Sequence, residues 1–172
     1  MDIIKGRVYK FGDDINTDVI YPGKYLSITT DREEMAGHCF ESVYPEFLKT
    51  ARQGDIIVAG KNFGCGSSRE QAASCLKHFG MGAVIAESFA RIFYRNAINL
   101  GLPVITAPGI TDFAEHGDTI EIDLGDGMIK NYRTGLTLPS TKLPPFIVEI
   151  ISEGGLIKHL QKKLGTKNME DK

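Results

Sequence analysis

The chain has 172 residues, of which 42% are hydrophobic and 24% charged, and its formal net charge is −2. This composition is that of a globular protein, and the near-neutral charge provides no basic field for nucleic acid or an anionic membrane surface. No apolar run approaches the roughly 20 residues of a membrane span, and the N-terminus lacks a signal-peptide pattern, so we predict a cytoplasmic protein. We predict one domain at residues 1–165 and a frayed polar tail at residues 166–172.

The first third of the chain alternates short apolar segments with polar turns. In chain order we predict a strand at 3–11, a polar turn at 12–18, a long surface loop at 19–34, a short helix at 45–55 and a strand at 55–60. Pro22 and Gly23 interrupt any regular element in the loop, and Gly54 is expected to stop the helix. The pattern therefore predicts strands and one short helix joined by irregular segments.

The middle third alternates strands and helices, and the last third contains a hairpin. We predict helices at 68–80, 88–101 and 154–165, strands at 82–87 and 102–107, a β-hairpin at 118–134 and a proline-rich connection at 138–146. Gly80 and Gly101 stand where helix C-caps belong, and Ser88 is a candidate N-cap. The alternation predicts an α/β core with parallel strand pairing, flanked by β elements.

The three cysteines, Cys39, Cys65 and Cys75, fit neither a disulfide framework nor a metal site. An odd number of cysteines without a signal-peptide pattern argues against disulfides. No pair has CxxC-type spacing, and the set is not an iron–sulfur ligand run, so we expect no metal in this chain. Cys39 and Cys75 are predicted to be small core residues.

Residues 62–70, NFGCGSSRE, lie between a predicted strand and a predicted helix, where α/β proteins receive ligands. The segment lacks the lysine of a P-loop and the third glycine of a dinucleotide fingerprint. One interpretation is a glycine turn in which Ser67 or Ser68 is an ordinary N-cap of the helix, because both begin an S-x-x-E/Q capping box.

The other interpretation of this segment is an anion site. The N–H groups of Gly66, Ser67 and Ser68 at a helix start favour negative charge, and Arg69 adds a cation whose fork suits a carboxylate. The same field would stabilise a serine alkoxide and lower the pKa of Cys65. No histidine has a spacing that marks it as the partner of Cys65, so a cysteine nucleophile is the weaker hypothesis.

Three ordered motifs carry a specific resemblance: GDDINTD at 12–18, FGCGSSRE at 63–70 and ESFARIFYRNAINLGLP at 87–103. They resemble the small subunits of the aconitase superfamily, and the nearest branch is the 3-isopropylmalate dehydratases with their homoaconitase and dimethylmalate dehydratase relatives. The resemblance runs from Gly6 to about Leu164. Gln71 stands where many members have histidine, which leaves the core motif intact.

The resemblance implies a fold, a partner and a reaction. The fold would be a swivelling β/β/α domain, as in the aconitase C-terminal domain. The partner would be a separate large subunit that holds a [4Fe–4S] cluster, in a heterodimer or heterotetramer, and the isolated chain could form a homo-oligomer through the face meant for that subunit. The reaction would remove water from a 2-hydroxy acid and add it back at the neighbouring carbon.

The resemblance also assigns roles to residues of this chain. Ser67 would take the carbon-bound proton, Ser68 and Arg69 with Gly66 would hold a substrate carboxylate, and Asp18 would tune the site by pairing with a group on the large subunit. Arg91 and Arg95, four residues apart on a predicted helix, are interpreted as a solvated face and left off the site.

Substrate choice would depend on a loop that approaches the variable part of the substrate. The loop consists of Tyr25, Leu26, Ser27, Ile28, Thr29 and Thr30. Relatives that accept a third carboxylate place an arginine here, and this chain has none before Arg32, so we expect an apolar substituent to be favoured. Arg32 bending back, or a cation from the large subunit, is the alternative.

We therefore predict a hydro-lyase subunit for the interconversion of 3-isopropylmalate and 2-isopropylmalate in leucine biosynthesis. Alternatives within the family are a homoaconitase or a dimethylmalate/citramalate-type dehydratase. An alternative of another class is a non-catalytic carboxylate-binding module. Neither nucleic acid nor a membrane is expected as a partner.

Overall fold

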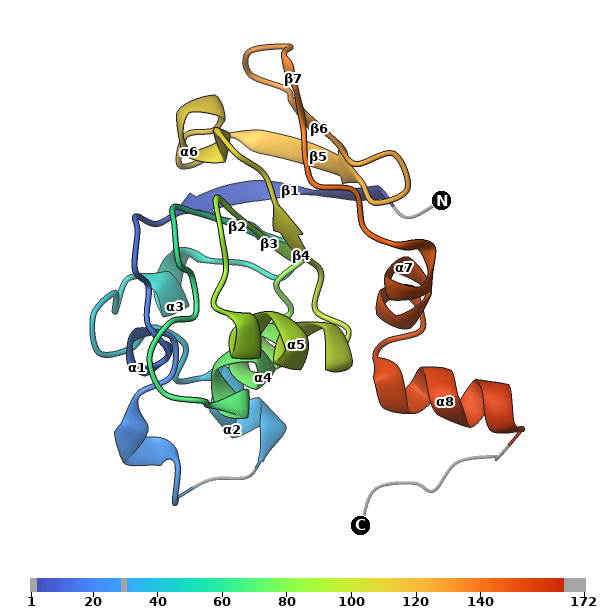
Figure 1. The fold of residues 1–172 in the computed structure, drawn as a ribbon. Helices are drawn as coiled ribbons and strands as arrows, with labels where there is room; N and C mark the ends of the chain where they lie inside the picture. The colour runs from blue at the N-terminus through green and yellow to red at the C-terminus, as the bar shows by residue number, and fades with distance from the viewer. Residues whose placement is uncertain (1–2, 29–30, 166–172) are drawn as a thin grey trace.

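The computed structural model describes residues 3–28 and 31–165 (Figure 1). The predicted tail at 166–172 lies outside the described residues. Within the described part, the strands form one seven-stranded sheet in the order β4-β3-β2-β1-β5-β6-β7. The strands are β1 (Ile3–Lys10), β2 (Ile56–Ala59), β3 (Ala83–Ala86), β4 (Val104–Thr106), β5 (Thr119–Asp123), β6 (Met128–Asn131) and β7 (Thr137–Pro139).

The sheet has a parallel half and an antiparallel half that share β1. β1 pairs in parallel with β2, and β2, β3 and β4 continue the parallel order, with Val8 opposite Ile56 and Ile57 opposite Val84. On its other edge β1 pairs antiparallel with β5, which forms the expected hairpin with β6. Every residue of β2 and β3 is buried, as expected of strands covered on both faces.

Both faces of the parallel half are covered because the sheet curls. One core cluster lies between this half and the helices α4 (Glu70–Phe79) and α5 (Arg91–Asn99), and it includes Ile57, Val84 and Phe93. A second cluster joins Ile56 to the antiparallel half through residues such as Ile122. Figure 1 shows the resulting layers, with β5, β6 and β7 on one side of the parallel strands and α4 and α5 on the other. The predicted α/β class with β/β/α layering is confirmed.

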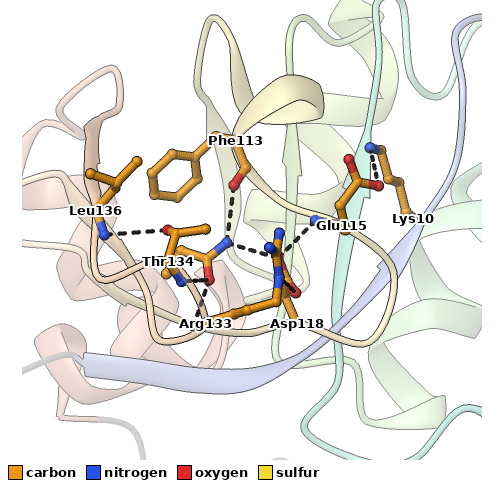
Figure 2. A network of polar contacts seen from close by, with 8 residues as sticks. Lys10, Phe113, Glu115, Asp118, Arg133, Thr134 and Leu136 are labelled. Atoms are coloured by element: carbon orange, nitrogen blue, oxygen red, sulfur yellow. Dashed lines mark hydrogen bonds and ion pairs between the residues drawn. The ribbon is translucent and has the colours of Figure 1, made fainter.

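A buried carboxylate, Asp118, ties the antiparallel half together (Figure 2). It accepts hydrogen bonds from Asn131 Nδ2 at 2.8 Å and from the Glu115 backbone at 2.9 Å, and Arg133 Nε lies 2.5 Å from Oδ1. Asn131 also donates to the carbonyl of Phe113 at 3.0 Å. The Arg133 hydrogen bond is the main reason that the pKa of Asp118 lies far below its ordinary value.

The helices differ from the predictions most strongly in the first third of the chain. The remaining helices are α1 (Thr17–Ile20), η1 (Gly23–Tyr25), α2 (Arg32–Ala36), α3 (Phe47–Thr50), α6 (Ile110–Phe113), α7 (Pro145–Ser152) and α8 (Leu156–Leu164). The predicted surface loop at 19–34 is wrong in part, because it contains the end of α1, all of η1 and the start of α2, and it buries Ile20 and Tyr21 completely. Asn16 starts α1 by accepting a hydrogen bond from Val19 N at 2.9 Å.

Smaller corrections concern helix ends. The helix predicted at 45–55 is only the single turn α3, which ends before Ala51 rather than at Gly54. Ser88 does not cap α5, which begins after Ala90, and its hydroxyl instead accepts from the backbone of Asn62. The C-cap of α4 at Gly80 is confirmed by its left-handed backbone. Among the described residues, no helix is long and apolar enough to cross a membrane.

Candidate functional site

The candidate site forms where two loops leave neighbouring parallel strands at the same edge of the sheet. One loop follows β1 and contains residues 12–18, and the other follows β2 and contains residues 60–69. Backbone bonds join them: Gly60 N to the Gly12 carbonyl at 3.0 Å, and Thr17 N to the Cys65 carbonyl at 2.8 Å. The topology therefore places the first two sequence motifs side by side, at the edge where α/β sheets bind ligands.

Two glycines allow the second loop to pass this close to its neighbours. Gly64 has a φ of +80°, and a Cβ at this position would lie 2.3 Å from the Phe93 ring. Gly66 has a φ of +94° and lies against Thr17, whose hydroxyl donates to the carbonyl of Ser67 at 2.9 Å. A side chain at Gly64 would displace α5, so the glycines bring the loop, α5 and the first motif together.

The capping interpretation of the serines is wrong. α4 begins at Glu70, its N-cap residue is Arg69, and no side chain accepts from its first turn. Ser67 and Ser68 precede the helix and are exposed, and neither hydroxyl has a hydrogen-bond partner among residues 3–28 and 31–165. Both hydroxyls are consequently available to a ligand, as is the uncapped helix start beside them.

Arg69 is held by Asp18 from the first motif. Its Nη1 forms an ion pair with Asp18 Oδ1, and the arginine side chain is 19% exposed while the aspartate side chain is 60% exposed. Asp18 thus has a partner within this chain, whereas the resemblance suggested one on the large subunit. The pair orients the guanidinium, and the arginine side chain keeps a small exposed part beside the pocket that it lines.

A pocket of about 160 Å³ contains this chemistry. Ser67 and Arg69 line it together with Thr17, Arg91 and Ile92, the last two from the first turn of α5. Because the first residues of α5 line the pocket and its N-cap residue Ala90 makes no side-chain cap, the positive end of α5 lies beside the same space. The pocket therefore offers a hydroxyl, two guanidinium groups and a helix start, a set suited to a carboxylate ligand.

Arg91 is the residue that sequence reasoning left out. It was grouped with Arg95 as a solvated face, yet of the two only Arg91 lines the pocket. The available signal was its position: β3 lies beside β2 in parallel, so the segment after β3 must approach the loop after β2. The backbone bonds from Phe63 N to the Ser88 carbonyl at 3.0 Å and from Ala90 N to the Phe63 carbonyl at 2.9 Å make that connection.

The cysteines behave partly as predicted. Cys39 and Cys75 are buried in the core, which confirms that prediction. The expectation for Cys65 is wrong in direction, because burial, with Asp14 adding to it, raises the pKa of this thiol. Among the described residues, no three His, Cys, Asp or Glu side chains form a cluster that could hold a metal ion.

The loop expected to select substrate lies beside the site and not in the pocket. Tyr25 and Leu26 pack against the core, and Ile28 is 69% exposed. Thr29 and Thr30 lie outside the described residues. None of residues 25–28 lines the pocket, and Arg32 lines a separate hollow with Glu70 and His78.

A protein-family comparison covers this whole region. The model described as the aconitase C-terminal domain matches residues 13–108, which include the first loop from residue 13 onward, the second loop, α4 and α5. The chain belongs to the aconitase C-terminal domain family. This confirms the resemblance inferred from the three motifs.

Individual members of the aconitase C-terminal domain family are similar over nearly their full length. The chain is 52% identical over 162 residues to 3-isopropylmalate dehydratase small subunit 1 of Methanopyrus kandleri, covering 94% of this chain and 95% of that protein. It is also 52% identical over 164 residues to the methanogen homoaconitase small subunit of Methanothermobacter thermautotrophicus, covering 95% and 94%. A crystal structure of 3-isopropylmalate dehydratase from Methanocaldococcus jannaschii matches with a TM-score of 0.88 at 50% identity, over 94% of this chain and 95% of that one.

Proposed function

We propose that the chain is the small subunit of a hydro-lyase that isomerises 3-isopropylmalate and 2-isopropylmalate by removing and re-adding water. The observation that carries this proposal is the pocket that Ser67 lines with Arg69 and the start of α5, where the Ser67 hydroxyl has no hydrogen-bond partner among the described residues. Relatives named as 3-isopropylmalate dehydratase small subunits align with at least 94% of this chain and are 52% and 54% identical to it. Their names support a separate large subunit as the partner of this chain.

Ser67 would act as the base. In the dehydration direction, its oxygen takes the proton from the carbon next to the carbinol, the C–H electrons form the double bond, and the hydroxyl group leaves the neighbouring carbon. Arg69, Arg91 and the positive end of α5 would stabilise the serine alkoxide, which is otherwise a poor species in water. Re-addition of water at the other carbon returns a proton from Ser67 and completes the isomerisation.

Arg69 and Ser68 would bind a substrate carboxylate. A guanidinium bonds a carboxylate through two parallel N–H groups, and Asp18 keeps the side chain from rotating away. Holding the substrate in one orientation matters because Ser67 must take a proton from one carbon and return a proton when water is added back.

The chain's own donors do not form an iron–sulfur site. Its cysteines lie in two different places, two in the core and one in the glycine loop. We therefore assign the expected [4Fe–4S] cluster to the large subunit, where it would supply Lewis acidity at the leaving hydroxyl.

The preference for an apolar substituent rests on the loop at residues 25–28. This segment carries no cation that could meet a third carboxylate, and Ile28 presents an apolar side chain to solvent. Arg32 lies over another hollow, which weakens the alternative in which it bends back to the site. A methyl-substituted malate is the second substrate that fits the same argument, and homocitrate is the one that fits it least.

Reconstitution tests the proposal. The chain is mixed anaerobically with the large subunit encoded beside it, supplied with iron and sulfide, and assayed against 3-isopropylmalate, citramalate, dimethylmalate, homocitrate and citrate. We expect turnover of 3-isopropylmalate to be fastest and the chain alone to be inactive. Ligand binding by the chain without any turnover in the complex would favour a non-catalytic carboxylate-binding module instead.

A further inference from the structure

A short turn beside the pocket touches the Arg69–Asp18 pair. Gly23 begins η1, and a Cβ built on it would lie 3.1 Å from Arg69 Nη1 and 3.3 Å from Asp18 Oδ1. Both distances are shorter than ordinary van der Waals contact for a Cβ. The Gly23 backbone is therefore one wall of the space that the guanidinium occupies, although it makes no hydrogen bond to it.

The position of η1 is set by four side chains that we name the Glu41 clamp: Lys24, Tyr25, His38 and Glu41. The Tyr25 hydroxyl donates to Glu41 Oε1 at 3.0 Å, and His38 Nδ1 lies 2.9 Å from Glu41 Oε2. The Tyr25 and His38 rings stack with centroids 3.6 Å apart and planes inclined by 14°. Lys24 Nζ lies 4.7 Å from the Tyr25 ring centroid and 4.0 Å from Glu41 Oε1.

The clamp connects η1 to a fixed part of the core. Phe40, between His38 and Glu41, is fully buried, and its N–H donates to the carbonyl of Ile20 at 2.9 Å. The hydrogen bond from Tyr25 is the main reason that the pKa of Glu41 is lowered, so its carboxylate is charged and accepts from both neighbours at neutral pH. Residues 23–25 are thus tied by side chains to residues 38–41, which the core holds in place.

We propose that Gly23 and the Glu41 clamp are positioning elements for Arg69: the clamp holds η1 so that Gly23 limits where the guanidinium can lie, and this sets substrate affinity. The consequence for affinity rests on the proposed function, in which Arg69 binds a substrate carboxylate. Glu41 and Tyr25 do not line the Ser67 pocket, so in this role they act through the backbone of η1. Loss of the clamp would let η1 move and let the guanidinium leave the orientation that suits a carboxylate.

Variants can separate this role from general stability. Gly23 does not have a left-handed backbone, so Gly23→Ala is compatible with the chain conformation and acts through the contact with Arg69. Its matched control is Gly125→Ala, because a Cβ on Gly125 would meet a carboxylate oxygen at a similar distance, Asp123 Oδ1 at 3.2 Å, and Gly125 does not line the Ser67 pocket. Glu41→Ala and Tyr25→Phe open the clamp. Glu46→Ala is their control, since it removes a surface carboxylate whose ion pair within the described part of the chain is with Lys49.

Two measurements decide the proposal. The first is steady-state kinetics of the reconstituted complex with 3-isopropylmalate, where we expect Gly23→Ala and Glu41→Ala to raise KM about ten-fold with kcat changed less than about two-fold. Tyr25→Phe should raise KM by a smaller factor, and the controls should match wild type. The second is the NMR resonance of Arg69 Nε–H in the chain alone, which is assigned by its loss in Arg69→Lys. We expect this resonance to shift in the clamp variants and in Gly23→Ala, and to stay unchanged in the controls.

The two measurements also distinguish this inference from the proposed function. Suppose that the wild-type complex turns over substrate. If Gly23→Ala and Glu41→Ala then match the controls both in KM and in the Arg69 resonance, the positioning role is overturned. If the wild-type complex is inactive with every acid, the proposed function fails. The resonance still decides the positioning role in that case, with a shift supporting it and no shift refuting it.

Discussion

Replacing Arg69 by lysine keeps the positive charge and removes the guanidinium fork. The Arg69–Asp18 pair is exposed on the aspartate side, with 60% of that side chain accessible, so we expect a loss of folding stability below about 1 kcal/mol. A hydrogen bond to a charged group is worth about 1.5–3 kcal/mol, and about 1.4 kcal/mol corresponds to a factor of ten. Losing one of two such bonds to a carboxylate should therefore lower kcat/KM about ten- to hundred-fold, mostly through KM.

The assay is steady-state kinetics of the reconstituted complex, with thermal unfolding of the chain measured in parallel. Arg95→Lys is the matched control, because Arg95 is an exposed residue of α5 outside the pocket lining, and it should behave as wild type. An unchanged KM in Arg69→Lys would refute the reasoning, since it would mean that Arg69 only holds Asp18.

Three further predictions concern other parts of the molecule. Asp118→Asn should lower the free energy of unfolding by about 2 kcal/mol at pH 7, because charge-assisted bonds to a buried carboxylate are lost. The pKa of Asp118 is lowered in the folded state, so its contribution to stability is complete above the unfolded pKa of about 3.9. Denaturant titrations should therefore show that the difference in the free energy of unfolding between wild type and Asp118→Asn shrinks as the pH falls below that value. Ile28→Arg should fold normally, since Ile28 is 69% exposed, and should raise the ratio of homocitrate to 3-isopropylmalate turnover; an unchanged ratio would contradict the loop argument. Cys65→Ala should keep kcat within about two-fold of wild type, because the raised pKa of the thiol leaves little thiolate, and a large loss would revive the cysteine hypothesis.

The central strands of the parallel half, β2 and β3, could be predicted from the sequence because they are short, fully apolar and separated by the periodic helix α4. β2 and β3 consist only of buried residues, and α4 ends at Gly80, so hydrophobic pattern and glycine position agree with the structure. The hairpin of β5 and β6 was likewise marked by alternation and an Asp-Gly turn.

The elements that were missed are those fixed by distant contacts. The segment at 19–34 contains Pro22 and Gly23, which indicate a loop, yet Tyr21 is fully buried in a core formed by residues far away in the chain. β7 is a three-residue strand that is defined by its pairing with β6. α7 begins at Pro145 after its N-cap residue Pro144, and these two prolines suggested an irregular connection. Local propensity carries no information on such contacts.

The sequence identified part of the residue set that the structure brings together in the pocket, but not its arrangement. The motifs identified Ser67 and Arg69, and the sheet topology explains why Asp18 lies beside them. The start of α4 was placed too early, because an S-x-x-E pattern predicts a cap whether or not the serine is in reach of the first turn. Arg91 was missed because helical spacing alone does not show which end of α5 meets the loop.

The most direct test of the central claim is the rate at which the reconstituted enzyme forms the unsaturated acid when Ser67 is replaced by alanine. The Ser67 hydroxyl has no partner among the described residues, so the change should cost less than about 0.5 kcal/mol of stability and leave the complex assembled. Ser152→Ala, which removes a surface hydroxyl bonded to the Val148 carbonyl, serves as control. We predict that Ser67→Ala lowers the dehydration rate about a thousand-fold or more while the control keeps it. A rate near that of wild type in Ser67→Ala would contradict the assignment of Ser67 as the base.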